Sequence, residues 1–387
     1  MSDITHAVAA RTLFDGVNVR KDAAVLIRGE QIVGISDRNE VSSSVPVQEL
    51  PDAVWLAPGF IDIQVNGGGD LLFNDAPTPD TMQAIAKAHR RFGTTALLPT
   101  LISDSPDKMP KALAAVEEAA AANPSILGIH LEGPFLSPER AGVHDPRALR
   151  RPTQADIALI TAKRKSATLV TLAPEQAGEG VIAALVNAGI HVALGHSMAT
   201  YAQTVAAMRQ GLTGFTHLFN AMQPLQSREP GPIAAALESP DAWYGLIADG
   251  VHVAPAMLRL ALRGAGHPIL VTDAMPPVGG TRASFRLNGE DIFVRDGRCA
   301  TRDGTLAGAA LDMATAVRNC VRLLDVPLQD ALRFASTHPA QFLGFGRVLG
   351  RLLPGFRADM VALDSESISV VQTWVAGVAA PSYCGGA

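Results

Sequence analysis

Carboxylate and imidazole side chains stand where three apolar segments of this sequence end. Glu132 closes the run ILGIHLE, His196 closes IHVALGH, and His217 lies within GFTHLFN. One carboxylate and two imidazoles can bind zinc or iron(II) and leave a position open for water. His130 lies two residues before Glu132 on the same face of the expected strand, and we interpret it as a supporting residue instead of a ligand. The sequence therefore predicts a divalent metal site.

Asp273 ends a fourth segment of this kind, HPILVTD. A metal-activated water needs a nearby carboxylate to accept its proton and later to pass it to a leaving amine. A buried aspartate also needs a cationic neighbour, which the metal would supply. The alternative is that Asp273 caps the segment that follows it. The three expected ligands nearby favour the catalytic interpretation.

Eight short strand-like segments alternate with alanine-rich helical stretches and would bring these residues together. The stretch from Thr200 to Gln210, for example, precedes Gly211, a residue typical of helix C-termini. Apolar segments without polar alternation indicate buried parallel strands, so eight strand–helix units predict a (β/α)8 TIM-like barrel of the α/β class. An open doubly wound sheet is the rival, but no GxGxxG follows an early strand. The expected strands are 57–66, 94–100, 126–132, 167–173, 190–196, 214–220, 243–249 and 267–273.

In such a barrel the carboxyl ends of the strands form the catalytic face, so the polar residues at those ends should converge. The two ends of the chain lack helical periodicity and contain strand-and-turn segments such as AAVLIRGEQIVGI. We therefore expect one small β-sandwich domain from residues 1–56 and 347–387, and a barrel from residues 57–346. The Gly/Pro-rich stretches 51–59 and 350–357 would connect the two.

The composition excludes several other classes of protein. The formal net charge of −5 is spread without basic, aromatic-interleaved runs, which argues against nucleic acid as a partner. The three cysteines, Cys299, Cys320 and Cys384, form no CxxC pair, so we expect free thiols in a reducing compartment. The N-terminal segment lacks a basic-then-apolar leader, and no apolar run reaches about 18 residues. We expect a cytoplasmic protein that binds neither nucleic acid nor membranes.

A series of short motifs runs through the whole chain in a fixed order. These are PGFIDIQVNGGGDLLFND near residue 58, PTLISDSP near residue 100, HLEGPF at 130–135, LGHS at 194–197, THLFNAM at 216–222, REPG at 228–231, DGVH at 249–252, VTDAM at 271–275 and GTLAG at 304–308. The set resembles the N-acetylglucosamine-6-phosphate deacetylase family of the amidohydrolase superfamily. The resemblance implies a (β/α)8 barrel with a β-sandwich made from both termini. It also implies hydrolysis of the acetamide of N-acetyl-D-glucosamine 6-phosphate to D-glucosamine 6-phosphate and acetate.

The resemblance assigns roles in the chemistry to five residues of this sequence. Glu132, His196 and His217 would bind the metal, and Asp273 would be the general base and then the general acid. His144 would orient or polarise the acetamide carbonyl. The cofactor would be one divalent metal ion per chain, with zinc expected first and iron(II) or another divalent metal as alternatives.

The resemblance also assigns residues around the substrate, a phosphorylated amino sugar. Arg228 is expected to reach the site of a neighbouring subunit, which implies a homodimer or a homotetramer. His252 and Arg228 would add positive charge near the phosphate. The remaining substrate-binding residues would be Val143, which presents backbone to the sugar, Asn220 and Ala221 near the phosphate, and Leu306, Ala307 and Gly308 over the acetyl side.

The metal count follows from a departure from the wider superfamily. Binuclear relatives place an HxH pair at the end of the first barrel strand, whereas this chain has Gln64 and Asn66 there. The fourth strand ends in LAPE, without the lysine that would bridge two metals. Amide oxygens are weak ligands for zinc or iron, so we expect one metal, with both amides hydrogen-bonding in the barrel mouth.

Two alternatives remain beside this hypothesis. The substrate could be another amide, such as an N-acetylgalactosamine phosphate; the missing lysine argues against a cyclic imide. A non-catalytic scaffold with the same barrel is the other. A scaffold has no reason to keep a buried polar cluster that costs stability when it is unpaired.

Overall fold

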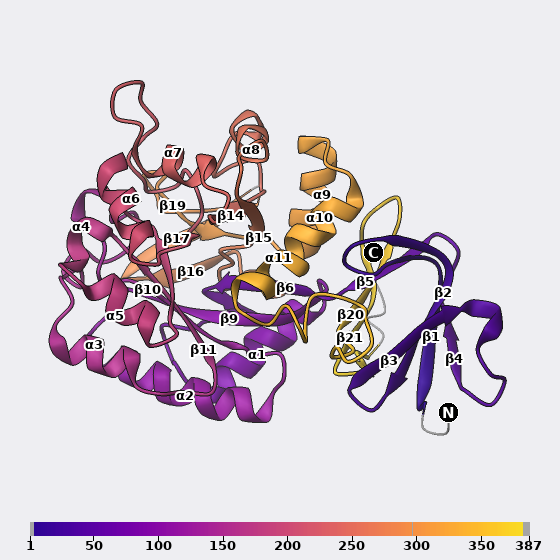
Figure 1. Ribbon diagram of the computed structural model, residues 1–387. Coiled ribbons are helices and arrows are strands. Elements are labelled where there is room, and N and C mark those ends of the chain that lie inside the picture. The colour runs from indigo at the N-terminus through magenta and orange to yellow at the C-terminus, as the bar shows by residue number, and fades with distance from the viewer. Residues whose placement is uncertain (1–3, 296, 382–387) are drawn as a thin grey trace. The chain divides into compact units, whose positions relative to one another are not determined.

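The computed structural model describes residues 4–295 and 297–381, which form two compact units (Figure 1). One unit takes the described residues within 1–62, 86–96 and 312–387, and the other takes 63–85 and 97–311. Cys299 and Cys320 are buried free thiols, as expected, whereas Cys384 lies outside the described residues. Within the described ranges no helix is both long and apolar enough to cross a membrane.

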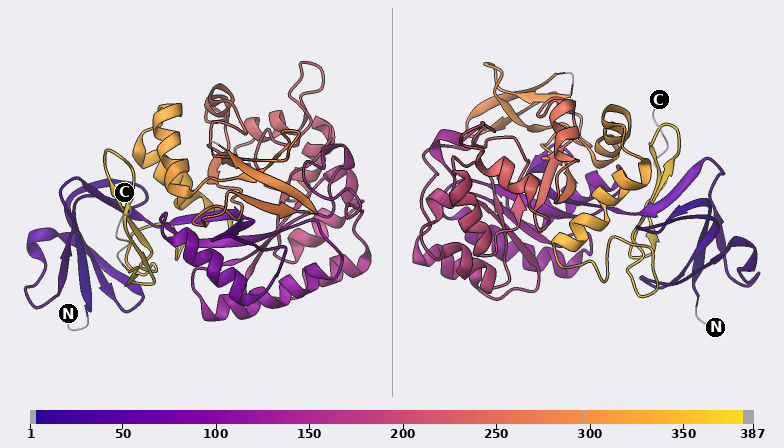
Figure 2. Two further views of the ribbon diagram at one scale, coloured as in Figure 1. Left: turned by 180° about the vertical axis from the view of Figure 1, so that it is seen from behind. Right: turned by 45° about the horizontal axis from the view of Figure 1, so that its top comes forward.

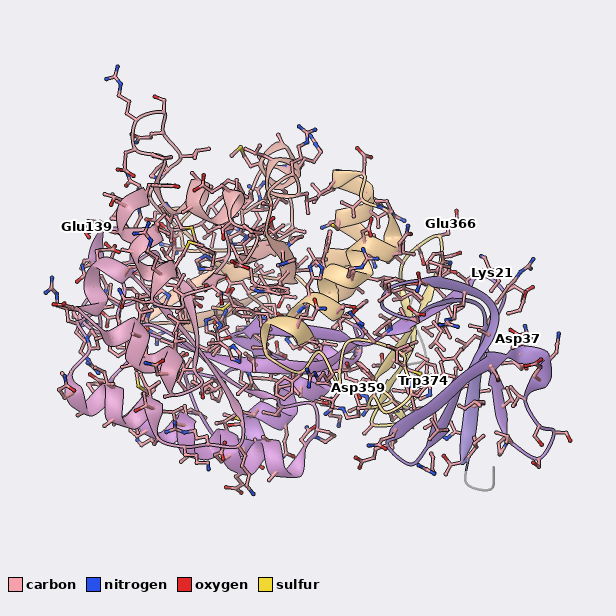
Figure 3. All side chains as sticks on the ribbon, in the orientation of Figure 1. Lys21, Asp37, Glu139, Asp359, Glu366 and Trp374 are labelled. Carbon is pink, nitrogen blue, oxygen red and sulfur yellow. The ribbon has the colours of Figure 1, made fainter. Side chains whose placement is uncertain are left out.

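Strands from both ends of the chain form one eight-stranded sheet. Strand β1 pairs with β2 antiparallel and with β5 parallel, and β5 pairs antiparallel with β20 so that Pro58 lies opposite Met360. The Trp374 side chain, labelled in Figure 3, is buried in the apolar core of this unit. The predicted sheet domain from the two termini is thus confirmed. Its strands are β1 (His6–Phe14), β2 (Val19–Arg28), β3 (Gln31–Asp37), β4 (Val47–Glu49), β5 (Val54–Pro58), β20 (Met360–Asp364), β21 (Val370–Val375) and β22 (Val378–Ala379), with η1 (Arg38–Glu40) after β3.

Eight parallel strands form the second sheet, in the order β15-β14-β13-β12-β11-β10-β9-β6. All residues of β6, β9 and β10 are buried, which is typical of parallel strands covered on both faces. A bridge between Val65 and Ala274 links the first strand to the chain just after the last, so the ring is nearly closed. The predicted α/β barrel is confirmed. The strands are β6 (Phe60–Val65), β9 (Thr94–Ile102), β10 (Gly128–Glu132), β11 (Ala167–Leu172), β12 (His191–Leu194), β13 (Gly214–Phe215), β14 (Trp243–Ile247) and β15 (His267–Val271).

The expected extents of several strands were wrong. Strand β12 ends two residues before His196, β13 stops two residues before His217, and β15 ends two residues before Asp273. All three polar residues have positive φ, which an extended strand cannot contain. The expected strand 57–66 is also split, because β5 ends at Pro58 in one sheet and β6 begins at Phe60 in the other.

Helices follow the barrel strands, and α2 to α6 lie along the outside of the strands in Figure 1. The predicted helix at 200–210 is α6, whose N-terminus is capped by the Thr200 side chain. Helix α3 begins with a capping box, in which Thr153 accepts a hydrogen bond from the Asp156 backbone and the Asp156 side chain bonds back to Thr153 N. The helices are α1 (Pro79–Arg90), α2 (Lys108–Ala122), η2 (Pro138–Arg140), α3 (Gln154–Thr161), α4 (Pro174–Ala177), α5 (Val181–Asn187), α6 (Tyr201–Arg209), α7 (Gly231–Glu238), α8 (Pro255–Ala261), α9 (Met313–Leu324), α10 (Leu328–Ala335) and α11 (Thr337–Phe342).

A small four-stranded antiparallel sheet follows β15 and is drawn in orange at the edge of the barrel unit in Figure 2. Ala309 N donates to Asp273 O at 2.9 Å, and Met275 N donates to Ala309 O at 3.0 Å. These bonds fix the GTLAG segment beside the VTDAM segment. The strands are β16 (Ser284–Leu287), β17 (Glu290–Arg295), β18 (Arg298–Ala300) and β19 (Leu306–Ala309), and a separate pair consists of β7 (Gly67–Gly68) and β8 (Leu71–Leu72).

Candidate active site

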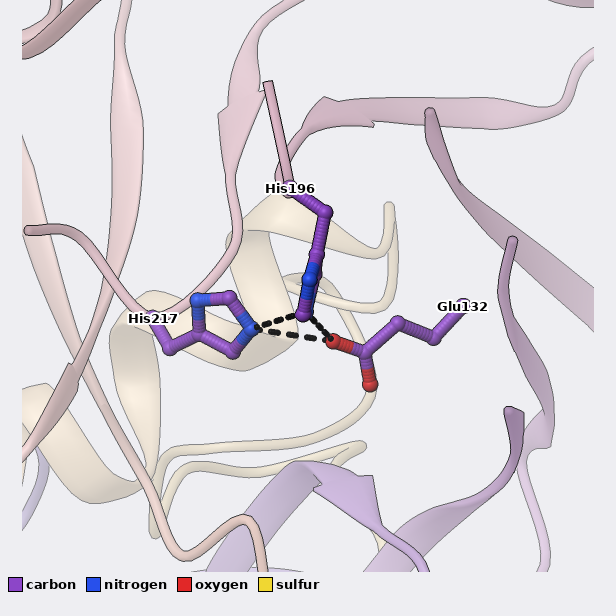
Figure 4. Close-up of side chains that lie close together, drawn as sticks. All are labelled: Glu132, His196 and His217. Atoms are coloured by element: carbon purple, nitrogen blue, oxygen red, sulfur yellow. Dashed lines mark hydrogen bonds and ion pairs between the residues drawn. The ribbon is translucent and has the colours of Figure 1, made fainter. Parts of the chain in front are cut away.

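Three ligand atoms from three strand ends converge in the barrel (Figure 4). The Nε2 atom of His217 lies 2.9 Å from Glu132 Oε1 and 3.1 Å from His196 Nε2, and His196 Nε2 lies 3.2 Å from Glu132 Oε1. Ligand atoms bound about 2.0–2.1 Å from a tetrahedral zinc are about 3.3–3.5 Å apart. The three side chains are buried, and a small outward shift would give them the spacing that a metal ion requires.

The electrostatics of this cluster also favour a cation. Burial acts to raise the pKa of Glu132, but hydrogen bonds from His196 and His217 hold that pKa well below its ordinary value. Burial acts to lower the pKa of His217, but the Glu132 carboxylate beside it raises that pKa overall. Without a metal, the cluster therefore favours an ionised carboxylate and a protonated imidazole. A divalent cation would supply that positive charge.

The backbone carries strain where it presents these side chains. His196, His217 and Asp273 adopt the left-handed region, with φ of 48°, 34° and 51°. Each such residue costs about 1–3 kcal/mol and persists only when its surroundings hold it. Ser137 N donates to His196 O at 2.9 Å, and the small sheet binds Asp273 O.

The His196 ring is oriented by a backbone carbonyl. Its Nδ1 atom lies 2.7 Å from Arg140 O, and a carbonyl oxygen can only accept. Nδ1 therefore carries a proton, so Nε2, which faces Glu132 and His217, is the nitrogen that would offer its lone pair to a metal ion. A partner of this kind is what a metal-binding histidine requires.

Asp273 accepts hydrogen bonds from both first-strand amides. Its Oδ1 atom lies 2.6 Å from Asn66 Nδ2 and 3.3 Å from Gln64 Nε2, and Gln64 Nε2 lies 3.1 Å from Glu132 Oε2. The amides thus face the carboxylates with their donor groups, as the metal-count hypothesis requires. Burial, and then the charge of Glu132, raises the pKa of Asp273 to about 6. The alternative role as a helix N-cap is wrong, because the element after Asp273 is strand β16.

His144 is held against the cluster by Ser103. The Nδ1 atom of His144 lies 2.8 Å from Ser103 Oγ and 3.3 Å from Ser103 N, and a backbone N–H can only donate. The neutral ring therefore carries its proton on Nε2. Burial, and then the neighbouring His196, lowers the pKa of His144 to about 3, so the ring is a neutral hydrogen-bond donor at neutral pH. The imidazole rings of His144 and His196 meet edge to face, with their centroids 4.4 Å apart.

His130 is not among the converging ligand atoms, in agreement with its interpretation as a supporting residue. Its Nε2 lies 2.7 Å from Thr171 Oγ1, and its Nδ1 lies 3.1 Å from Ile63 O. Burial lowers the pKa of His130 to about 4. Both ring nitrogens are engaged, so the orientation of the ring is fixed by Thr171 and the Ile63 carbonyl.

A pocket of about 300 Å³ opens over the cluster and collects most of the residues that the sequence suggested. Two of them do not line it in this chain: Arg228 is exposed, and Ala307 is fully buried between Leu306 and Gly308. The suggested residues in the pocket wall are Glu132, Val143, His144, His196, His217, Asn220, Ala221, His252, Asp273, Leu306 and Gly308.

Several contributors were missed by sequence reasoning. Ser103, the Arg140 carbonyl and Asn288 carry no signal of their own in one sequence, because hydroxyl, carbonyl and amide groups are common in loops. Asn288 occupies the tight turn between β16 and β17, and its Nδ2 donates to Val143 O at 2.8 Å. The turn itself could have been predicted from the sequence, since Asn288 and Gly289 form the dipeptide typical of such hairpins.

Known proteins resemble this chain over nearly its whole length. The model of the amidohydrolase family matches residues 55–380. An N-acetylgalactosamine-6-phosphate deacetylase of Shewanella sp. (strain ANA-3) is 40% identical over 378 residues, which cover 96% of this chain and 94% of the relative. An N-acetylglucosamine-6-phosphate deacetylase of Haemophilus influenzae is 33% identical over 377 residues, 96% of this chain and 98% of the relative. The crystal structure of N-acetylglucosamine-6-phosphate deacetylase from Pasteurella multocida matches with a TM-score of 0.93 at 32% identity, over 97% of this chain and 99% of the other.

Proposed function

Because this chain belongs to the amidohydrolase family, we propose that it hydrolyses the acetamide of N-acetyl-D-glucosamine 6-phosphate to D-glucosamine 6-phosphate and acetate. The observation that carries the proposal is the convergence of Glu132, His196 and His217 beside Asp273 and His144 in one pocket. This is a set of groups for metal-assisted amide hydrolysis.

We propose one divalent metal ion per chain, held by Glu132, His196 and His217. Two imidazole nitrogens and one carboxylate oxygen suit zinc first and iron(II) second. When bound, such an ion would polarise a carbonyl and lower the pKa of water, so that water loses a proton near neutral pH and becomes a strong nucleophile. The donor groups of Gln64 and Asn66 face the carboxylates, which supports a single ion.

Asp273 is the proton carrier in this proposal. Its carboxylate accepts the proton of the attacking water, while the amide of Asn66 holds Oδ1 at 2.6 Å. The same oxygen or its partner then gives the proton to the amine nitrogen as the C–N bond breaks. Burial raises the pKa of Asp273 and favours its protonated form, so the carboxylate accepts the proton of water more readily than an exposed aspartate would.

His144 is the donor to the acetyl carbonyl in this proposal. Ser103 holds Nδ1 as an acceptor, so Nε2–H is directed at the oxygen on which negative charge develops during attack. The lowered pKa keeps the ring neutral, and the ring gives a hydrogen bond without becoming a competing acid. Leu306 and Gly308 would close over the acetyl group, with the buried Ala307 holding the backbone between them.

The phosphate would bind at the opposite side of the pocket. Asn220 and Ala221 would approach it, Ala221 through its backbone N–H because Asn220 N already donates to His217 O at 2.9 Å, and Val143 would present backbone to the sugar. His252 donates from Nδ1 to Asp249 at 2.6 Å, which fixes the ring and leaves Nε2 for a ligand. We propose that Arg228, exposed on its own chain, completes the site of a second subunit in a homodimer or a homotetramer.

Two further proposals concern the organisation and location of the chain. We propose domain boundaries at 1–56 with 347–387 and at 57–346, supported by the strands of the terminal sheet, which lie within 6–58 and 360–379. We also propose a cytoplasmic location, supported by the buried free thiols Cys299 and Cys320.

Acetate release from the phosphorylated and the unphosphorylated sugar tests the function directly. The metal-loaded protein is expected to hydrolyse the 6-phosphate faster at low substrate concentration. The galacto epimer belongs in the same assay, since a relative at 40% identity is an N-acetylgalactosamine-6-phosphate deacetylase. Absence of acetate from both phosphorylated epimers would refute the proposal. Mixing Arg228→Ala chains with Asp273→Asn chains should restore part of the activity if sites are shared.

A further inference from the structure

Glu175 is a carboxylate that the proposed chemistry does not use, yet it binds a loop of the catalytic face. It is the second residue of α4, shortly after β11, and it does not line the pocket. Its Oε2 atom accepts a hydrogen bond from Ser197 Oγ at 2.8 Å, and its Oε1 atom accepts one from Met198 N at 2.6 Å. Ser197 and Met198 directly follow His196, a proposed metal ligand.

These hydrogen bonds satisfy one fully buried hydroxyl and one neighbouring backbone N–H. Ser197 is fully buried, and its Oγ also accepts a hydrogen bond from Ala199 N at 3.0 Å. Loss of the carboxylate would leave a buried hydroxyl and a backbone N–H without their acceptor. His196 has a left-handed backbone at φ 48°, so it depends on the contacts of its neighbours to stay in place.

Ser197 extends the connection to the next loop of the face. Its backbone N donates to Ala221 O at 3.0 Å, and Gln223 N donates to Ser197 O at 2.9 Å. Ala221 is also left-handed, with φ of 49°. One continuous set of hydrogen bonds thus runs from Glu175 through Ser197 to the loop that would hold the phosphate.

We propose that Glu175 is a positioning residue that fixes His196 for the metal and, through Ser197, the Asn220–Ala221 backbone for the phosphate. It acts through these residues and contacts neither metal nor substrate. The phosphate half of this inference rests on the proposed function, whereas the metal half requires only the ligand cluster.

Glu117 offers a matched control in the same unit. This carboxylate on α2 accepts hydrogen bonds from Lys165 N and Ser166 N, both at 3.0 Å, and a further one from Ser166 Oγ. These partners precede β11 at Ala167, so they lie at the amino end of the strand whose carboxyl end leads to Glu175. Both carboxylates thus bind one serine hydroxyl and neighbouring backbone, but only Glu175 is connected to the metal cluster.

Zinc affinity measured without substrate is the first test, by competition with a chromophoric chelator. Glu175→Ala should weaken zinc binding about 10–100-fold, the usual effect of losing a group that orients a metal ligand. Glu117→Ala should stay within about threefold, because changes at distant sites do not couple. Glu175→Gln should give a smaller loss than Glu175→Ala, since its one oxygen can still accept from Met198 N while the Ser197 hydroxyl loses its acceptor. Wild-type zinc affinity in Glu175→Ala, or an equal loss in Glu117→Ala, would overturn the inference.

The zinc-saturated proteins give the second test. Glu175→Ala should raise KM for the phosphorylated sugar about tenfold more than KM for the unphosphorylated sugar, and Glu117→Ala should change both equally little. An equal rise for both sugars would overturn the phosphate half. Failure of the proposed function would be visible separately, as absence of acetate release by the wild type, while the zinc titration would still decide the metal half. If Glu175→Ala does not fold, Ser197→Ala removes one of the same bonds, and wild-type zinc affinity there would overturn the inference.

Discussion

Replacement of Asp273 by asparagine isolates the proton-transfer role of one carboxylate. In the wild type, Asn66 Nδ2 lies 2.6 Å from Asp273 Oδ1. Asparagine at position 273 keeps an acceptor oxygen for this hydrogen bond but cannot take a proton from water. Loss of a positioned general base costs about 10²–10⁴ in rate. At about 1.36 kcal/mol for each factor of ten, the barrier should rise by roughly 3–5 kcal/mol.

The same substitution should leave the stability of the metal-free protein unchanged or increase it, although it lowers the rate of hydrolysis. Burial raises the pKa of Asp273 to about 6, above its value in the unfolded chain of about 4. The unfolded state therefore releases the Asp273 proton at lower pH, and the folded wild type loses stability as the pH rises from about 4 to about 6. The neutral asparagine has no such loss. The variant without metal should thus unfold at the same temperature as the wild type at pH 7, or at a higher one.

The assay compares kcat for acetate release in zinc-loaded proteins of equal metal content across pH. The wild type should lose activity as the pH falls and Asp273 becomes protonated, and the variant should lack this limb. Asp70→Asn is the matched control, because Asp70 is also a left-handed aspartate, with φ of 66°, outside the pocket wall. A kcat within tenfold of the wild type in metal-replete Asp273→Asn would refute the role of Asp273 as the base.

Four shorter predictions concern other residues. His144→Ala should lower kcat by about 10²–10³ without loss of metal, because the donor to the developing oxyanion is removed; unchanged kcat/KM would assign the ring a packing role. Gln64→Ala should retain one equivalent of metal by elemental analysis, and a drop from two equivalents to one would contradict the single-metal site. Arg228→Ala should weaken binding of the phosphorylated sugar by about 1.5–3 kcal/mol, measured through KM, and should affect binding of the unphosphorylated sugar much less. Thr153→Ala should reduce the free energy of unfolding by about 1 kcal/mol through loss of the α3 cap, measured by denaturant titration; no change would mean that Asp156 holds the cap alone.

The barrel could be predicted because its strands are buried on both faces. Short segments of mostly apolar and β-branched residues without polar alternation, such as 94–100 and 126–132, are typical of buried strands, and the helices between them carry clear end signals. The strand ends could not be predicted as well. Whether a strand continues through His217 depends on a backbone angle that neither hydrophobic pattern nor residue type determines.

In the candidate site, too, some residues could be predicted from the sequence and others could not. Glu132, His196, His217 and Asp273 were readable because charged or imidazole groups at the ends of apolar strands need a reason to be there. The groups that orient them were not, since Ser103 and Glu175 look like ordinary loop residues and the Arg140 carbonyl is present in any sequence. Their roles depend on contacts between segments that are distant in the sequence, by 41 residues for Ser103 and His144 and by 56 for Arg140 and His196.

The left-handed backbone of His196, His217 and Asp273 links chemistry to the evolutionary fate of the fold. Glycine has no Cβ and adopts this conformation without the steric cost that histidine or aspartate bears, so selection for stability alone would favour glycine at these positions. Only continued selection for activity keeps the less stable residues in place. A descendant of this chain that had lost its activity should therefore accumulate glycine at these positions while its apolar strands stayed unchanged. The identities of these three residues would then distinguish working enzymes from inactive copies in a collection of related sequences.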